Sequence, residues 1–474
     1  MAVAARGIGG SAYRQGGIHS SGGLPNEEDF GFTVTIDVHD RWLAVLAFFL
    51  AAMIYNANFR SISTGDSRAT RYIPFALWHD QTVYLDSLLD LTVDGFETRQ
   101  YWVKEGRNGR QSSTYPVTTP VLVAPLYLPA VFYLESRGWR SPDVTDVSFL
   151  MEKLAASFVA SLSVGGMYLV LRRRTDRRNA LLLTGAYAFG TTTWAISSQA
   201  LWQHGPAQLM VVALLWLLTG PPSALRSLAA GAATGLLVAI RPSDIPIAIA
   251  FGVGAILWSY PRKVELALFA LSSLIPVVLV GYYNVATFGN LAGGYALLGI
   301  SSKFFSHSRL EGLAGLLASP TRGLFVFSPF LLFLPFLFRR SWRDKQWKSL
   351  TLVLGGGILL QLAFYSGVDF RQGYSFGPRF LTDMLPILIW MMAPVLPTLS
   401  KPLWAGFLVA TAVAIWIQSV GAFQYTDSSN RAIFQPTATT AEAWKWGNSP
   451  FIEDATGPRQ PATMVGAVLR LSNR

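Results

Sequence analysis

The 474-residue chain contains no cysteine, and charged residues make up only 14% of it. Without cysteine, neither a disulfide nor a cysteine-ligated metal site can form. A typical soluble domain has about 25% charged residues, so the shortage of charge argues against an ordinary soluble protein. Hydrophobic residues make up 51% of the sequence, which indicates a chain that lies mostly in a membrane.

Nucleotide-binding and metal-binding motifs are also missing. The sequence has no P-loop, no glycine-rich dinucleotide fingerprint after a strand, and no carboxylate–histidine pattern with metal-ligand spacing. The net charge is +11, which in a soluble protein would suggest a nucleic-acid partner. In a membrane protein we assign this excess to cytoplasmic loops near anionic lipids, and we expect membrane lipids rather than nucleic acid as partners.

Long uncharged runs recur along the chain. A helix needs roughly 20 apolar residues to span a bilayer, and most of these runs are long enough. They predict an all-α polytopic bundle of about eleven transmembrane helices. The runs cover residues 42–59, 154–171, 180–203, 205–225, 227–240, 245–261, 266–302, 323–338, 349–368, 384–400 and 402–426.

Two basic clusters set the predicted topology, because basic loops stay in the cytoplasm. The first is Arg172–Arg178, and the second runs from Arg339 through Arg343 and Lys345 to Lys348. Six predicted spans lie between them, an even number, so both clusters fit on the same side. Residues 1–41 then form a flexible cytoplasmic tail, and residues 42–426 form the transmembrane domain. Residues 60–145 become the first external loop, and residues 427–474 an extracytoplasmic tail.

The apolar segment 119–135 is ambiguous. Prolines at 120, 125 and 129 weaken a regular helix there, and a full crossing would place Arg172–Arg178 outside. We interpret the segment as an interfacial or re-entrant helix in the first external loop. The alternative is a true span with an exception to the charge rule.

Ionisable side chains gather at the predicted outer face. Asp66 follows the first span, and either it or Ser67 would cap an amphipathic helix over residues 67–80. Such a carboxylate suits a base that acts on a substrate arriving from the membrane. As an alternative, Asp66 serves only as a helix cap. Neighbouring candidates for substrate binding are Arg68, Arg71, Tyr72 and Tyr115.

Later loops at the same face supply further candidates. Gln203 and His204 lie in a tight turn, where a structural histidine is the simpler alternative. Arg241 is bracketed by apolar runs, where a charge is costly and suggests function; pairing with Asp244 is the structural alternative. Gly373 and Gly377 force turns in a loop that could clamp a phosphate or form only an Asp–Arg pair. Its candidates are Asp369, Arg371, Tyr374 and Arg379, and Asp383 would cap the next span or pair with one of these arginines.

Taken in order, several short motifs resemble the GT-C superfamily of membrane glycosyltransferases, which includes protein O-mannosyltransferases and the aminoarabinose transferase of lipid A. The resemblance covers roughly residues 42–426, and no single motif is specific. The motifs are Gly65-Asp66 with Tyr72-Ile73-Pro74, the stretch 115–120, Arg241-Pro242, the stretch 319–329, and the stretch 376–383.

This resemblance implies an enzyme of the bacterial cytoplasmic membrane with its active site on the extracytoplasmic side. Asp66 would be the general base, and juxtamembrane helices would occupy the first external loop. The donor would be a polyprenyl-phosphate sugar and the acceptor a glycan, lipid or protein hydroxyl, with inversion at the anomeric carbon. Arg241, Arg371 and Arg379 would hold the donor phosphate. Such enzymes usually need no cofactor or metal, although the oligosaccharyltransferase branch does. Many carry a second acid where this chain has His204.

Two other function classes remain open at this point. A transporter or flippase of lipid-linked sugars would place charges near the bilayer midplane and often shows repeat symmetry, whereas these charges cluster at one face. A non-catalytic membrane subunit is the third possibility. Purified protein that transfers sugar from a synthetic lipid donor would separate the enzyme from both.

Overall fold

A computed structural model describes residues 36–91, 101–298, 308–336, 346–435 and 438–474. Most of the predicted N-terminal tail and the basic residues Arg339, Arg340, Arg343 and Lys345 lie outside these ranges. The described part is almost entirely helical, with one antiparallel pair of short strands, β1 (Val103–Glu105) and β2 (Gln111–Ser113). The predicted all-α polytopic class is confirmed.

Seven segments are long and apolar enough to cross a membrane. Five are the single helices α1 (Val38–Asn56), α6 (Ser141–Arg172), α11 (Lys263–Phe288), α15 (Lys348–Ser366) and α17 (Lys401–Phe423). The other two are Pro242–Ser259, formed by η4 (Pro242–Asp244) and α10 (Ile245–Ser259), and Thr118–Ser136. The protein is therefore an integral membrane protein.

The remaining predicted spans fold as shorter or interrupted apolar elements. They are α7 (Arg177–Phe189) with the π-helical turn η3 (Thr193–Ser197), α8 (His204–Leu218), α9 (Ala224–Ile240), α13 (Leu324–Phe327) with η6 (Pro329–Phe336), and α16 (Leu385–Met392) with η8 (Leu396–Thr398).

Short elements complete the described chain. The segment predicted as the first external loop holds α2 (Gly65–His79) and α3 (Asp86–Leu91). Between spans lie η5 (Gly293–Leu298), α12 (Arg309–Ala318) and η7 (Arg379–Leu381). The C-terminal part folds as α18 (Ser428–Phe434), η9 (Thr440–Trp444), η10 (Trp446–Asn448), α19 (Pro450–Ala455) and α20 (Thr463–Ser472).

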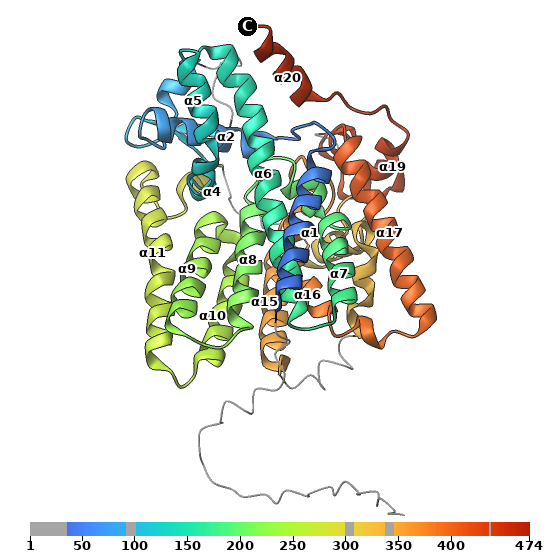
Figure 1. The fold of residues 1–474 in the computed structure, drawn as a ribbon. Helices are drawn as coiled ribbons and strands as arrows, with labels where there is room; N and C mark the ends of the chain where they lie inside the picture. Colours follow the sequence, from blue (N-terminus) through green and yellow to red (C-terminus); the bar gives the residue numbers. More distant parts are fainter. Residues whose placement is uncertain (1–35, 92–100, 299–307, 337–345, 436–437) are drawn as a thin grey trace, which may run out of the picture. The chain divides into compact units, whose positions relative to one another are not determined.

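The ambiguous segment is broken, as its prolines predict. It forms α4 (Thr118–Val123), the 3-10 turn η2 (Ala124–Tyr127) and α5 (Leu128–Ser136). α4 and η2 pack against α2, and α5 packs against α6 (Figure 1). The segment therefore packs with the helices of the predicted first external loop. The segment is also long and apolar enough to span a membrane.

Close helix contacts depend on small residues. Gly231 and Gly235 on α9 face α11, and a Cβ atom on either would lie 2.1 or 2.2 Å from a backbone oxygen of that helix. Glycines four residues apart let two helix backbones approach closely in a membrane, where dispersion contacts drive packing. α11 therefore lies along α9 (Figure 1).

The basic cluster Arg172–Arg178 gathers other helix ends around it. The guanidinium Nε of Arg172 lies 2.8 Å from the carboxylate of Asp40, at the start of α1. Arg174 donates to Thr351 in the first turn of α15, and Arg178 lies over the ring of Trp404 at the start of α17. The predicted cytoplasmic residues Lys348 and Lys401, which begin α15 and α17, thus lie at the same end of the bundle as Arg172–Arg178.

Candidate active site

At the other end of the bundle, one cavity collects half of the predicted site residues. Its volume is about 610 Å³. Six of the residues singled out from the sequence line it: Asp66, Tyr115, Gln203, His204, Arg241 and Arg379. Residues that were not candidates from the sequence also line it, among them Tyr101, Lys104, Tyr295 and Tyr365.

Asp66 lies in the first turn of α2 and points away from the helix cap. The N-cap of this helix is Thr64 and not Asp66 or Ser67, although Ser67 takes part in the capping box by accepting from the backbone N–H of Thr64. Asp66 instead forms an ion pair with Arg379 and accepts hydrogen bonds from the hydroxyls of Tyr115, at 2.6 Å, and Tyr101, at 3.2 Å. Its side chain is 21% exposed, into the cavity.

The ionisation of Asp66 follows from these neighbours. Burial alone would raise its pKa, but the charge of Arg379 and the hydrogen bonds from Tyr115, Arg379 and Tyr101 outweigh burial and lower that pKa below its ordinary value. Burial and the nearby carboxylate raise the pKa of both Tyr101 and Tyr115. The two phenols therefore remain protonated donors to an ionised carboxylate.

Two glycines make room for this arrangement. A Cβ atom on Gly65 would lie 2.0 Å from the Tyr101 hydroxyl, and one on Gly373 would lie 2.2 Å from the Arg379 guanidinium. Gly373 and Gly377 both have positive φ, at 90° and 72°, which glycine adopts without steric cost. The turns predicted there are present, and they let Arg379 reach Asp66.

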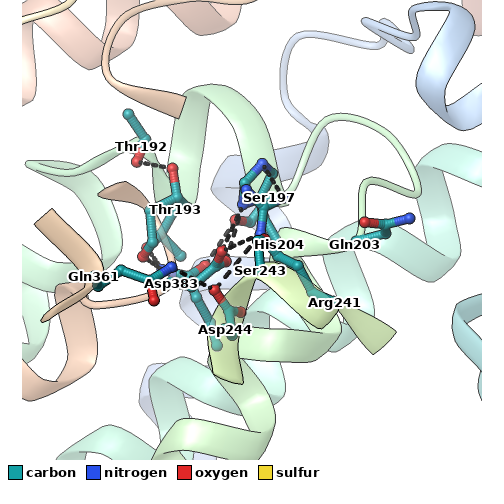
Figure 2. Close-up of polar contacts among 12 residues, drawn as sticks. Thr192, Thr193, Ser197, Gln203, His204, Arg241, Ser243, Asp244, Gln361 and Asp383 are labelled. Carbon is teal, nitrogen blue, oxygen red and sulfur yellow. Dashed lines mark hydrogen bonds and ion pairs between the residues drawn. The ribbon is translucent and has the colours of Figure 1, made fainter. Parts of the chain in front are cut away.

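A second polar cluster lies in the wall of the cavity, around His204 and Arg241 (Figure 2). The Nδ1 atom of His204 is 2.9 Å from the Asp383 carboxylate, and its Nε2 atom is 3.1 Å from Nη1 of Arg241. Since Nε2 faces a guanidinium donor, the geometry fits a neutral imidazole that donates from Nδ1.

Arg241 is bound on all sides within this cluster. Its Nε atom lies 2.8 Å from Asp383 and 3.6 Å from Asp244, and Nη2 donates to the hydroxyl of Tyr365 at 2.7 Å. Asp383 was expected to cap the next helix or pair with an arginine of its own loop. It pairs instead with Arg241, which is 142 positions earlier in the sequence.

Other predicted site residues lie outside the cavity lining. Arg71 pairs with buried Glu152 at 3.4 Å and donates to the Tyr72 hydroxyl, while Arg68 lies over the ring of Trp102. Asp369 and Arg371 pair with each other at 2.8 Å, and Tyr374 stacks on Phe434. The geometry gives these residues structural contacts, and their substrate-binding roles stay predictions.

Lys104 is the main addition to the site. It lies on β1, which the hydrogen bonds to β2 place at the cavity. Among the described residues it has no ion-pair partner. Its signal in the sequence was weak, because a single lysine in a loop of mixed charge gives no pattern. Across the described residues, no group of three or more His, Asp or Glu side chains is placed to hold a metal ion.

Comparison with known proteins gives a structural match. No family model and no curated protein matches the sequence. The fold is similar to the crystal structure of ArnT from Cupriavidus metallidurans bound to undecaprenyl phosphate, with a TM-score of 0.51. The chain shares the fold of ArnT. The match covers 83% of this chain and 68% of ArnT at 15% sequence identity, so it supports the GT-C resemblance at the level of fold.

Proposed function

We propose that this protein is a membrane glycosyltransferase that moves a sugar from a polyprenyl-phosphate donor to an acceptor hydroxyl, with Asp66 as general base. One observation carries the proposal: an ionised carboxylate and three cations, Lys104, Arg241 and Arg379, share one cavity at one end of the helix bundle. The ArnT structure of similar fold contains undecaprenyl phosphate, which supports a lipid phosphate as part of the donor.

The proposed transfer needs a negatively charged base for the proton and positively charged groups for the leaving phosphate, placed close together. The acceptor oxygen attacks the anomeric carbon and its proton passes to Asp66, while the bond from that carbon to the phosphate oxygen breaks. The polyprenyl phosphate leaves with the bonding electrons and gains negative charge. A single displacement of this kind inverts the anomeric centre.

The cations are suited to the leaving phosphate to different degrees. Lys104 has no carboxylate partner among the described residues. Arg379 is paired with Asp66, whose negative charge is lost when it takes the proton, so both cations can stabilise the developing charge where the bond breaks. Arg241 is already neutralised by Asp383 and Asp244. We therefore assign phosphate binding first to Arg379 and Lys104, and place Arg241 as a support of the wall.

The test is transfer by the purified Asp66→Asn variant from a synthetic polyprenyl-phosphate sugar. Removing a general base typically costs about 100- to 10,000-fold in rate, and we expect a loss in this range with unchanged thermal stability. Asp86→Asn is the matched control, because Asp86 lies in the same external segment, paired with Arg110 outside the cavity. Full activity of Asp66→Asn would exclude Asp66 as the base.

A further inference from the structure

On the cavity wall, the side-chain amide of Gln203 has one polar atom that no described residue satisfies. Gln203 is 8% exposed and lines the cavity. Its Oε1 atom accepts from the Tyr295 hydroxyl at 2.9 Å, whereas its Nε2 atom has no hydrogen-bond partner among the described residues. If the amide is turned over, Oε1 becomes the unpaired atom. A buried polar atom left unpaired costs free energy, so a ligand group that completes the bond is favoured here.

Gln203 is connected to the catalytic carboxylate through two tyrosines. Tyr115, which donates to Asp66, packs edge-on against Tyr295 with ring centroids 5.7 Å apart. Tyr295 in turn donates to Gln203. In Figure 2 Gln203 lies to one side of the His204 cluster, and no interaction joins it to the residues drawn. The amide and Asp66 therefore belong to one chain of contacts among the residues that line the cavity.

The charges around this amide exclude two kinds of sugar. Among the described residues that line the cavity, Asp66 is the only carboxylate. Arg379 and two tyrosines already bind it, so the ammonium group of an amino sugar would find no free carboxylate. A sugar carboxylate would need a free cation beside Gln203. Two aspartates already offset the charge of Arg241, and the other lining cations, Lys104 and Arg379, are assigned to the donor phosphate.

From these contacts we infer that Gln203 and Tyr295 form the subsite for the non-reacting hydroxyls of an uncharged donor sugar. A hydroxyl both donates and accepts hydrogen bonds, so it satisfies the unpaired amide atom in either orientation. The inference rests on the proposed function and adds a substrate class to it: neutral sugars, rather than amino sugars or uronic acids.

Binding measurements on the full-length protein in detergent test this inference. The probes are one short-chain polyprenyl phosphate alone and the same lipid carrying a neutral hexose, an amino sugar or a uronic acid. We expect the wild type to bind the neutral-sugar lipid most tightly of the three glycolipids. Gln203→Leu should lower the affinity for the neutral-sugar lipid by about tenfold relative to the affinity for the bare lipid, which is the value of one hydrogen bond.

Gln203→Glu gives the sharper readout, because it replaces the amide with a carboxylate of the same shape. We expect it to raise the affinity for the amino-sugar lipid relative to the neutral one, a reversal that simple loss of packing would not produce. Gln424→Leu is the control: Gln424 is half-buried, donates to the Ala455 carbonyl and does not line the cavity, so it should leave all ratios unchanged.

The possible failures can be told apart. A wild type that prefers the amino sugar or the uronic acid overturns the inference, as does a Gln203→Glu variant with wild-type ratios. In either case the proposed function stands if the bare lipid binds and the neutral sugar is transferred. If the wild type binds none of the four lipids, the proposed function itself fails, and the sugar subsite with it.

Discussion

At the scale of single residues, Arg379 controls the charge state of the site. It contacts Asp66 directly and lies over the Trp202 ring at 5.1 Å. Its charge, with the tyrosine hydrogen bonds, offsets the burial of Asp66, so the carboxylate is ionised at neutral pH. An ionised carboxylate can accept the acceptor's proton, and the same arginine is in place for the leaving phosphate.

This contact predicts a pH dependence. Arg379 lowers the pKa of Asp66, so in the wild type the loss of kcat/KM at acid pH should occur below the ordinary range of an aspartate. Arg379→Gln removes that charge, raises the pKa of Asp66, and should move the acid limb of the kcat/KM profile to higher pH.

The comparison needs a variant that removes an arginine elsewhere. Arg470→Gln breaks a pair with Asp146 in which the arginine is 55% exposed, and it should leave the acid limb unchanged. Identical acid limbs in the wild type and Arg379→Gln would contradict the assignment of Asp66 as the titrating base.

At the scale of elements, buried polar contacts fix the helix that carries Asp66. Arg71 on α2 pairs with Glu152 on α6, with side chains 3% and 0% exposed, and its guanidinium lies 3.9 Å from the centre of the Phe149 ring. Glu152 also accepts from Ser61, before α2. Arg71 therefore positions the helix that carries Asp66, and the substrate-binding role that the sequence suggested for Arg71 stays a prediction.

We predict that Arg71→Met destabilises the protein by about 3–5 kcal/mol, because it leaves the Glu152 carboxylate buried without its cation. The double variant Arg71→Met with Glu152→Leu should recover much of this loss, since an apolar pair needs no compensating charge. Denaturant titration in mixed micelles measures both. Equal stability of the single variant and the wild type would show that the pair does not hold α2.

The C-terminal helix α20 braces the same region. Arg470 and Arg474 pair with Asp146 and Asp143 near the start of α6, at 2.6 and 3.0 Å. The backbone N–H of Met464 donates to the carbonyl of Phe59, in the link between α1 and α2. The C-terminal part, predicted only as an external tail, thus contacts both α6 and the segment that leads into the helix carrying Asp66.

At the scale of the whole molecule, the two ends of the helix bundle differ in chemistry. The Arg172–Arg178 cluster is at the end of α6, and Glu152, which holds the Asp66 helix through Arg71, is in the other half of that helix. From the positive-inside rule we expect the basic end to face the cytoplasm. The cavity would then lie on the extracytoplasmic side, which is where a lipid-linked donor would meet its acceptor.

The absence of cysteine makes this orientation directly testable. Ser136→Cys introduces a thiol at an exposed position at the end of α5, and Ala224→Cys introduces one at the exposed start of α9. A membrane-impermeant maleimide should label the cysteine at 136 in intact cells and the one at 224 only after membrane disruption. Labelling in the opposite order would place the cavity on the cytoplasmic side.

The helical spans were predictable because backbone in lipid must satisfy its own hydrogen bonds, so long apolar runs become helices. The predicted spans over 180–203 and 323–338 are interrupted where polar or proline residues allow a π-turn or a 3-10 turn. Asp66 could be singled out because a carboxylate directly after the first predicted span is conspicuous in a chain with few charges. Lys104 and Tyr295 could not, since one polar residue in a loop has no periodic pattern.

By itself the sequence determined the class of protein and the end of the bundle where the ionisable groups gather, and it singled out Asp66 as a candidate base, because charge and hydropathy act locally along the chain. Only the tertiary structure decided which arginine meets which acid. Arg379 reaches Asp66 across 313 positions, while Arg371 stays with its neighbour Asp369. Such pairings depend on the turn at Gly373 and on the close contacts that Gly65 and Gly373 allow. These contacts form only when segments far apart in the sequence pack together.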